Sequence, residues 1–187
     1  MKVIPLFRNR SQLVARAAKQ DPKAQQEIFE QFSPKMLGVC RLYICDLQHA
    51  EDVMLGAFFK AFSHLSDFQD KGSFEGWLRK IMVRESISFL RTQKKLEFSE
   101  DLPMEATNSF NDIQSNIDVE HIQQLIDELP EGYRMVFVMY AIEGYKHREI
   151  AELLKIDEGT SKSQLFKARR MLQEQLKTFK KTNYATT

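Results

Sequence analysis

Apolar residues recur every three or four positions along most of the 187-residue chain, and this spacing predicts helices. Only 7 Gly and 5 Pro interrupt it, so an all-β chain is not expected. Residues 1–20 fit a short helical lead-in. The other predicted helices are 21–43 with a kink or break at Pro34, about 50–65, 74 to about 93, 118–129, 132–142, and a two-helix hairpin over 143–175. The chain is therefore predicted to be all-α.

Several short signals mark where these helices begin and end. Asp21-Pro22 combines an N-cap residue with Pro at the first helical position. Ser73 can cap the helix that follows it, and residues 46–49 are expected to form a turn. Residues 132–142 are almost continuously apolar and so resemble a buried strand as well. Gly144 stands where a helix-ending glycine belongs, which favours a buried helix on which the hairpin packs.

The second helix of the hairpin has a distinct polar side. Its apolar positions are Leu165, Ala168, Leu172 and Leu176. At about 100° per residue, the opposite side carries Thr160, Ser163, Lys167 and Arg170. Short polar and cationic groups on an exposed helix are what major-groove reading of DNA requires. The alternative is an ordinary helical hairpin with a solvated basic face.

The predicted helix over about 50–65 has more apolar surface than one buried face needs. Leu55 and Phe59 widen that face along one flank, and Glu51 and Asp52 lie beside it. Two interpretations are open: a broad contact with the core, or a docking surface for a partner.

The helix that starts at Phe74 is basic on one side. Its cations are Lys80, Arg84, Arg91, Lys94 and Lys95. Trp77 lies next to them, and the preceding segment Ser66–Gly72 is a polar loop. A basic helix face beside an aromatic ring suits a nucleic-acid backbone and an unstacked base. The alternative is a solvated helix with a half-buried tryptophan.

The net charge of +1 conceals a strong segregation of charge along the chain. Residues 77–95 carry a net charge of +5, and residues 144–187 also carry +5. Between them, residues 96–131 contain 10 Asp/Glu and no Lys or Arg. Residues 96–118 lack sustained periodicity and are predicted to be an acidic, flexible linker between two helical domains.

Several classes of protein are not supported. No apolar run reaches the roughly 18 residues of a membrane span, and the start of the chain lacks an export signal. Cys40 and Cys45 are predicted to be reduced thiols packed in a core. The four histidines have no metal-ligand spacing, and no phosphate-binding loop or nucleophile elbow occurs. We therefore expect a cytoplasmic protein that is not an enzyme and has no metal or cofactor.

Short motifs follow one another in a specific order. Ala50-Glu51-Asp52-Val53 precedes Gly76-Trp77-Leu78, which opens the basic helix. After the acidic segment come Leu129-Pro130-Glu131-Gly132-Tyr133-Arg134, Glu149-Ile150-Ala151-Glu152 and Glu158-Gly159-Thr160-Ser161-Lys162-Ser163. With these motifs, over about residues 20–95 and 119–177, the chain closely resembles the extracytoplasmic-function (ECF) sigma factors of bacterial RNA polymerase, within the sigma-70 family.

The resemblance implies a protein that binds core RNA polymerase and directs it to promoters. It implies a region-2-like domain over 1–95, a linker over 96–118, and a region-4-like helix-turn-helix domain over 119–187 with a disordered tail from about 178. Binding to the polymerase clamp would involve Glu51, Asp52, Leu55 and Phe59. Minus-ten recognition and melting would involve Ser66, Asp67, Phe68, Gln69, Lys71, Trp77, Lys80, Arg84 and Arg91. Minus-thirty-five recognition would involve Thr160, Lys162, Ser163, Gln164, Lys167 and Arg170.

The implied partners are core RNA polymerase, through its clamp coiled coil and its flap, and promoter DNA in duplex and single-stranded form. An anti-sigma factor is also implied, and the free protein is expected to be a monomer. Melting would require no hydrolysis, because tighter binding of the unpaired strand drives it. A base flipped into the loop needs hydrogen-bonding groups and a stacking surface, which Asp67, Phe68 and Gln69 can supply.

Five positions depart from the pattern that is common in the family. Leu55 stands where Gln is common, Arg84 and Ser88 where Asn and Asp are, and Lys155 where Gly forms the turn. Gln164 replaces a common Arg, and Gln pairs with adenine where Arg favours guanine. Two alternatives therefore stay open: a stand-alone helix-turn-helix regulator, and a sigma mimic that binds an anti-sigma factor.

Overall fold

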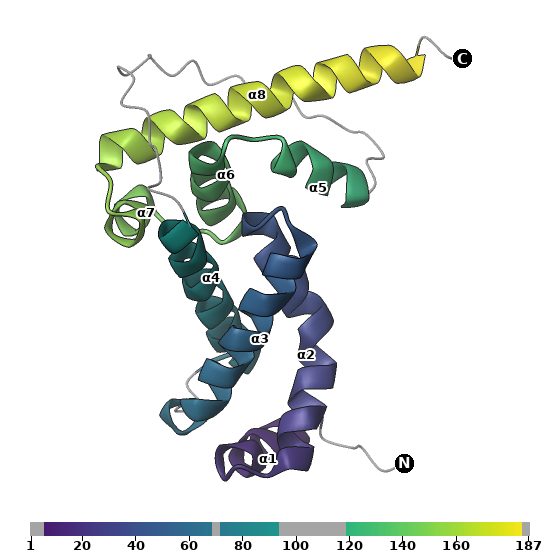
Figure 1. The fold of residues 1–187 in the computed structure, drawn as a ribbon, viewed down its shortest axis with the longest axis vertical. Coiled ribbons are helices and arrows are strands. Elements are labelled where there is room, and N and C mark those ends of the chain that lie inside the picture. Colours follow the sequence, from purple (N-terminus) through teal and green to yellow (C-terminus); the bar gives the residue numbers. More distant parts are fainter. Residues whose placement is uncertain (1–5, 69–71, 94–118, 185–187) are drawn as a thin grey trace. The chain divides into compact units, whose positions relative to one another are not determined.

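The computed structural model describes residues 6–68, 72–93 and 119–184, which form helices and the turns between them (Figure 1). No strand occurs within these three ranges, and the all-α prediction is confirmed. The chain divides into two compact units, Met1–Gln93 and Lys94–Thr187. The predicted linker, residues 96–118, lies outside the described residues.

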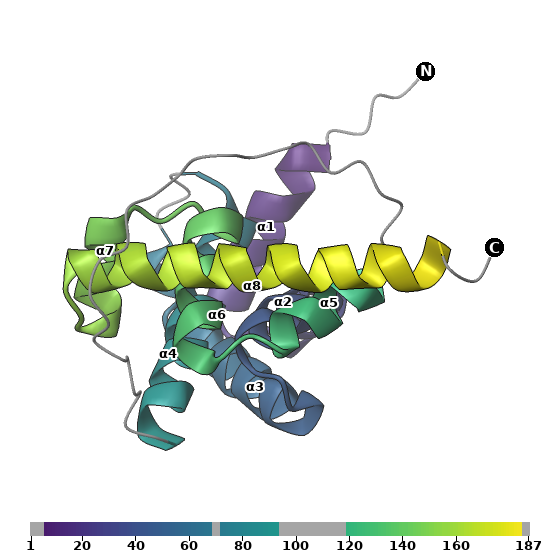
Figure 2. The ribbon, with the colours of Figure 1, turned by 90° about the horizontal axis from the view of Figure 1, so that it is seen from above.

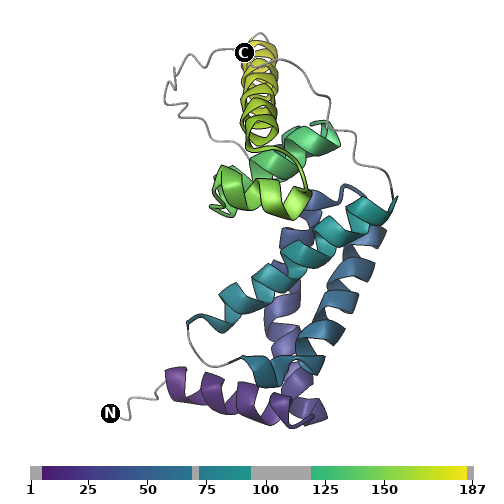
Figure 3. The ribbon, with the colours of Figure 1, turned by 90° about the vertical axis from the view of Figure 1, so that its left-hand side faces the viewer.

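The first unit contains α1 (Leu6–Ala18), α2 (Pro22–Tyr43), α3 (Leu47–Ser63), the 3₁₀ turn η1 (Leu65–Asp67) and α4 (Phe74–Gln93). Helices α2, α3 and α4 pack on one another, and α1 packs on α2 and η1 (Figure 3). Each helix contributes one apolar stripe to a common core. Ile28, Met36, Phe58, Leu78 and Met82 are almost completely buried there.

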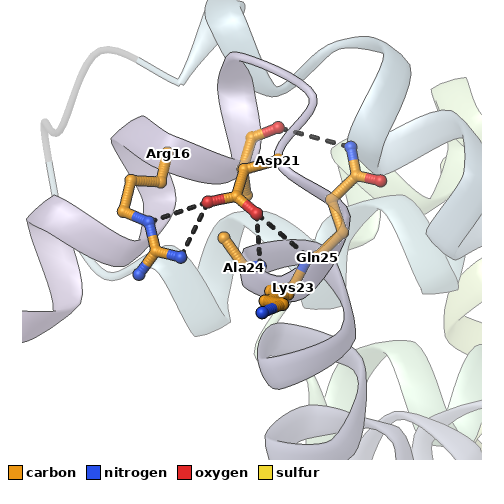
Figure 4. Close-up of polar contacts among 6 residues, drawn as sticks. Arg16, Asp21, Lys23, Ala24 and Gln25 are labelled. Atoms are coloured by element: carbon orange, nitrogen blue, oxygen red, sulfur yellow. Dashed lines mark hydrogen bonds and ion pairs between the residues drawn. The ribbon is translucent and has the colours of Figure 1, made fainter.

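The corner between α1 and α2 is fixed by Asp21 (Figure 4). Its carboxylate accepts hydrogen bonds from the backbone N–H of Lys23 (3.0 Å) and Ala24 (3.4 Å), as an N-cap residue does. The Arg16 guanidinium donates to the same carboxylate at 2.9 and 2.7 Å, and these bonds lower the pKa of Asp21. Gln25 Nε2 donates to the carbonyl of Ala17 at 3.3 Å. The corner holds α1 against α2.

Two boundaries in this unit differ from the prediction. Helix α2 continues through Pro34 without a break. Pro34 and Glu30 are exposed, so water can satisfy the Glu30 carbonyl that lacks an N–H donor. Helix α3 begins at Leu47, because the Asp46 side chain accepts a hydrogen bond from the His49 N–H (2.8 Å) and caps it. The predicted turn over 46–49 is therefore mostly the first turn of α3.

The two cysteines have different environments. Cys40 is buried, and burial raises the pKa of its thiol to about 11. Cys45 is exposed, because α2 ends at Tyr43 and the chain turns outward before Asp46. The prediction that both thiols pack in a core is wrong for Cys45.

The second unit contains α5 (Val119–Asp127), α6 (Glu131–Phe137), the π-helical turn η2 (Val138–Ile142), α7 (His147–Leu154) and α8 (Glu158–Tyr184). Helix α8 packs along α6 and across α7, with α7 near its N-terminal end (Figure 2). Met135, Val136, Val138, Met139 and Ile150 are fully buried. Residues 132–142 are thus the buried helical segment that the sequence predicts, and Gly144 follows it with φ +76°.

The C-terminal helix is longer than predicted. It continues to Tyr184, whereas the sequence predicts a disordered tail from about 178. Near this end of the helix, Gln175 Nε2 donates to Glu128 Oε2 at 2.7 Å, and Thr178 Oγ1 donates to the Glu174 carbonyl at 3.1 Å.

The turn between α7 and α8 requires a left-handed residue, and Lys155 supplies it with φ 57° and ψ 48°. The N–H of Ile156 donates to the Ala151 carbonyl at 3.1 Å, which ends α7. A non-Gly residue in this conformation costs roughly 1 kcal/mol. The chain follows the family turn although it lacks the glycine.

Replacing Lys155 with Gly is expected to raise the free energy of unfolding by about 1 kcal/mol, because glycine adopts φ > 0 without steric cost. Urea denaturation of the full chain measures the change. Lys155→Ala is the matched control and should show no gain, because alanine keeps the Cβ. A loss of stability in Lys155→Gly, or an equal gain in Lys155→Ala, would contradict the account of this turn.

Candidate functional site

The first turns of α8 bury two polar residues beside the expected apolar ones. Ser161 is 0% exposed and Gln164 is 1% exposed, and Leu165 and Ala168 are buried with them. Their shared side faces α6 and α7, on which α8 packs. The predicted buried face was the stripe that contains Leu165 and Ala168. Because Ser161 and Gln164 are also buried, the observed buried face is rotated around the helix axis toward these two residues.

This rotation changes which predicted residues face outward. Lys162 and Arg170 are exposed, and Ser163 is partly exposed with its Oγ donating to the Thr160 carbonyl at 3.0 Å. Thr160 and Lys167 are half-buried at the edge of the buried side. The Lys167 Nζ lies 5.9 Å from the centre of the Tyr133 ring, a cation–π contact within the unit.

Gln164 does not lie on the outward face. Its side chain is buried, and its Oε1 has no hydrogen-bond partner in the described structure. A side chain in this place cannot reach a base edge while α8 keeps its packing. We therefore correct its assignment as a base-contacting residue. Gln164 was assigned from the family resemblance, as the position where Arg is common, and the resemblance carries no information on its burial in this chain.

Two residues of α8 that the sequence analysis did not single out, Phe166 and Arg169, are partly exposed. Phe166 follows Ser163 by three positions and precedes Arg170 by four, which puts all three on one side of the helix. Arg169 lies with its Cζ 5.5 Å from the centre of the Tyr140 ring. The spacing of Ser163, Phe166 and Arg170 at i, i+3 and i+7 is the sequence signal that could have identified Phe166.

Two exposed cations of α8, Lys162 and Arg170, each pair with an exposed carboxylate. Lys162 Nζ lies 2.7 Å from Glu158 Oε1, and Arg170 Nε lies 3.1 Å from Glu174 Oε1. The hydrogen bond from Lys162 lowers the pKa of Glu158. Exposed pairs of this kind contribute little to stability, so either cation can exchange its carboxylate for a phosphate at little cost.

A second basic surface lies on α4. Trp77, Lys80, Arg84, Ser88 and Arg91 follow one another at intervals of three or four residues and so form one stripe. Lys80, Arg84 and Arg91 are exposed, and Trp77 is partly exposed. This stripe is the α4 basic stripe below. The opposite side of α4 is buried against α2 and α3.

The α4 basic stripe begins next to an aromatic cluster. The Phe68 ring lies 5.4 Å from Phe74 and 5.6 Å from Trp77, and Phe74 stacks on Trp77 at 5.8 Å. Phe68 therefore anchors the end of η1 to the start of α4. Ser66 and Asp67 are exposed in η1, whereas the predicted residues Gln69 and Lys71 lie outside the described residues.

Helix α3 exposes the apolar flank that the sequence left open to two interpretations. Phe59 is 75% exposed, Leu55 is 51% exposed and Leu47 is 54% exposed. Leu55 and Phe59 are four residues apart, and Leu47 precedes Leu55 by eight, so the three lie on one side of α3 with Glu51 between Leu47 and Leu55. We call Leu47, Leu55 and Phe59 the α3 apolar patch. The neighbouring Phe58 is 2% exposed and packs on Phe29 with ring centres 4.9 Å apart. The flank is not a core contact.

Within the described ranges, no group of three or more His, Cys, Asp or Glu side chains is arranged to hold a metal ion. Over the same ranges, each helix is too short or too polar to cross a membrane. Among the described residues, three exposed surfaces have a distinct chemical character: the outward face of α8, the α4 basic stripe with its aromatic cluster, and the α3 apolar patch.

Comparison with known families gives two matches. A model of sigma-70 region 2 matches residues 28–96, and a model of sigma-70 region 4 matches residues 120–172. The first spans α3 and α4, and the second spans the hairpin of α7 and α8. Both surfaces of the first unit and the outward face of α8 thus fall within matched regions.

Similar proteins agree with these matches. The RNA polymerase sigma-H factor of Pseudomonas aeruginosa is 26% identical over 178 residues, covering 88% of this chain and 92% of that protein. The ECF RNA polymerase sigma factor SigW of Bacillus subtilis is 26% identical over 178 residues, covering 88% and 95%. A solved structure of the sigma factor RpoE from Bartonella quintana, bound to the anti-sigma factor NepR, has the same fold (TM-score 0.52, 20% identity, 81% of this chain and 96% of that chain). The chain belongs to the sigma-70 family and is an ECF RNA polymerase sigma factor.

Proposed function

We propose that this sigma factor divides promoter recognition and polymerase binding among its three surfaces. The outward face of α8 reads the minus-thirty-five element as duplex DNA. The α4 basic stripe and the loop before it hold the unwound minus-ten strand. The α3 apolar patch binds the clamp coiled coil of core RNA polymerase. The observation that carries this proposal is the exposure of all three surfaces on helices whose opposite sides are buried.

The outward face of α8 has the chemistry for duplex reading. Lys162 and Arg170 neutralise phosphates, and Ser163 can donate to or accept from a base edge. Phe166 offers an apolar contact to a thymine methyl group. Thr160 and Lys167 lie at the edge of this face, where they can reach phosphates. A helix that follows a tight turn after a short helix is the form in which helix-turn-helix proteins enter the major groove.

The α4 basic stripe suits a single strand better than a duplex. Lys80, Arg84 and Arg91 run along one line and can follow a phosphate backbone. Trp77 gives a ring on which an unpaired base can stack. In the loop, Ser66, Asp67 and Gln69 would hydrogen-bond a flipped base, with Lys71 on its phosphate. Phe68 would shape that pocket through its contacts with Phe74 and Trp77.

The α3 apolar patch is suited to a helical partner. Leu47, Leu55 and Phe59 form a line along α3, and Glu51 and Asp52 lie beside it to pair with cations. Burying an exposed Phe or Leu contributes about 1.5–3 kcal/mol. Leu55, in a position where Gln is common in the family, would strengthen the apolar part of the contact.

Further partners follow from the family and from charge. The second unit would touch the polymerase flap, and the acidic residues 96–118 would occupy a positively charged channel of the polymerase. The Bartonella relative was solved with an anti-sigma factor, which supports such a partner here. The protein would act in the cytoplasm as a transcription initiation factor, as a monomer until it binds polymerase, with melting driven by binding alone.

In vitro transcription tests the function as a whole. Purified protein, core RNA polymerase and fragments of the source genome are expected to give transcripts that start at discrete sites sharing two spaced elements. Holoenzyme with Lys162→Gln and Arg170→Gln should bind these promoters about tenfold more weakly. The slope of log affinity against log salt concentration should become shallower by about 2, because each lost phosphate contact lowers that slope by about 1.

The same double variant should bind core polymerase normally. Lys177→Gln is the matched control, since Lys177 is exposed on α8 beyond the residues that the region 4 model matches. Unchanged promoter affinity in the double variant would contradict the role of α8. Stable core binding without any specific transcript would contradict the function and favour a sigma mimic. Specific duplex binding without core binding would favour a stand-alone regulator.

Replacing Phe59 with Ser is expected to weaken binding to core polymerase about tenfold or more, as loss of a buried aromatic anchor does. The free energy of unfolding should change by less than about 0.5 kcal/mol, because the ring is exposed. The neighbouring Phe58→Ala is the contrast: it should cost about 3–5 kcal/mol of stability. Equilibrium titration with labelled core and urea denaturation measure the two quantities. Full core affinity in the stable Phe59→Ser protein would contradict the docking role.

A further inference from the structure

The start of α7 is tied to both of its neighbours through one side chain, His147. Its ring stacks on Tyr140 in η2, with ring centres 4.5 Å apart and an angle of 24° between the planes. Its Nδ1 lies 2.9 Å from the Ser161 Oγ in the first turn of α8. One residue thus contacts the segment before α7 and the helix after it.

The cluster continues along α8. Arg169 lies over the same Tyr140 ring, with its Cζ 5.5 Å from the ring centre. Ser161 and Arg169 are about two turns apart on α8. The Tyr140 and His147 pair therefore holds α8 at two points along its length. Ser161 is completely buried, and its hydroxyl finds its partner in the imidazole.

We propose that His147 is a positioning residue, which sets the orientation of α8 relative to α7 and so the placement of the outward face of α8 on DNA. This rests on the proposed function, in which α8 reads duplex DNA. His147 need not touch DNA itself. It acts through Ser161 and Tyr140, and it would determine how sharply the protein separates its promoter from other sequences.

His147 can set the orientation of α8 because its contacts are directional, whereas apolar packing is not. The rest of the contact between α7 and α8 relies on apolar residues such as Ile150, Leu154 and Leu165. Apolar packing depends on buried area and tolerates small sliding movements, whereas a hydrogen bond and a ring stack fix distance and angle. Base-edge contacts are lost when a helix shifts within the groove, while phosphate contacts by long cations adapt.

The protonation state of the imidazole fits this role. Burial lowers the pKa of His147, and the neighbouring cations Lys162 and Arg169 lower it further, against the opposing effect of Glu158. A neutral ring can take the tautomer whose Nδ1 accepts a hydrogen bond from the Ser161 hydroxyl. It also stacks on Tyr140 without adding a third positive charge near Lys162 and Arg169.

The test measures the ratio of affinities of the holoenzyme for a promoter fragment and for the same fragment with a scrambled upstream element. The fragment is one obtained by transcription of genomic DNA as above. His147→Gln should lower this ratio about five- to tenfold while the affinity for the scrambled fragment stays constant. His147→Asn should keep most of the ratio, because its amide lies where Nδ1 was and can reach Ser161. Thr178→Ala, which removes an exposed hydroxyl from α8, should leave the ratio of affinities unchanged.

Ser161→Ala should lower the ratio less than His147→Gln does, because it leaves the stack on Tyr140 in place. The double variant should fall no further than His147→Gln alone, because that change already removes the contact with Ser161. Additive losses, equal losses on both fragments, or an unchanged ratio in His147→Gln would overturn the inference. If His147→Gln does not fold, Ser161→Ala and His147→Asn still decide between the outcomes. A wild-type holoenzyme that does not distinguish the two fragments would overturn the proposed function, and the inference with it.

Discussion

The packing of α8 on α6 and α7 is the constraint that decides which side of α8 faces outward. Only one side of a helix can be turned toward a groove, and the buried side decides which one it is. Here that side includes Ser161 and Gln164 as well as Leu165 and Ala168. The two polar residues turn the helix, so that Lys162, Phe166 and Arg170 share the outward half. In the proposed role of α8, its base preference would be set partly by residues that do not meet DNA.

In the first unit, the buried side of a helix likewise decides which surface is exposed, on both α3 and α4. Helices α3 and α4 each bury one side in the core that they form with α2, and each leaves a surface of different character outside. On α3 the exposed surface is apolar, which suits a protein partner. On α4 it is cationic and begins at a cluster of aromatic rings, which suits a single strand. The chain as a whole has a net charge of only +1, because the acidic residues 96–131 offset the two basic segments.

Helical spacing and capping residues were enough to predict the all-α fold and the bounds of α4, whereas the left-handed turn at Lys155 was implied by the family resemblance. The rest depended on tertiary contacts. Whether Phe59 faces the core or solvent is decided by where α2 and α4 lie, which the sequence of α3 alone does not contain. Gln164 was assigned to the DNA-contacting residues from the family resemblance, which does not show that its neighbours bury it in this chain. Pro34 interrupts a pattern but not a helix, because its exposed side lets water replace the missing donor.

Site-specific photo-crosslinking from α8 to promoter DNA tests the central claim most directly. A photoreactive residue at Phe166, in holoenzyme bound to a promoter, is expected to cross-link to the upstream duplex element. The same residue at Ala168, on the buried side, is expected to give protein contacts only, provided that the variant remains folded. Cross-links from position 166 to the unwound downstream strand, or none to DNA in a complex that still transcribes, would contradict the account.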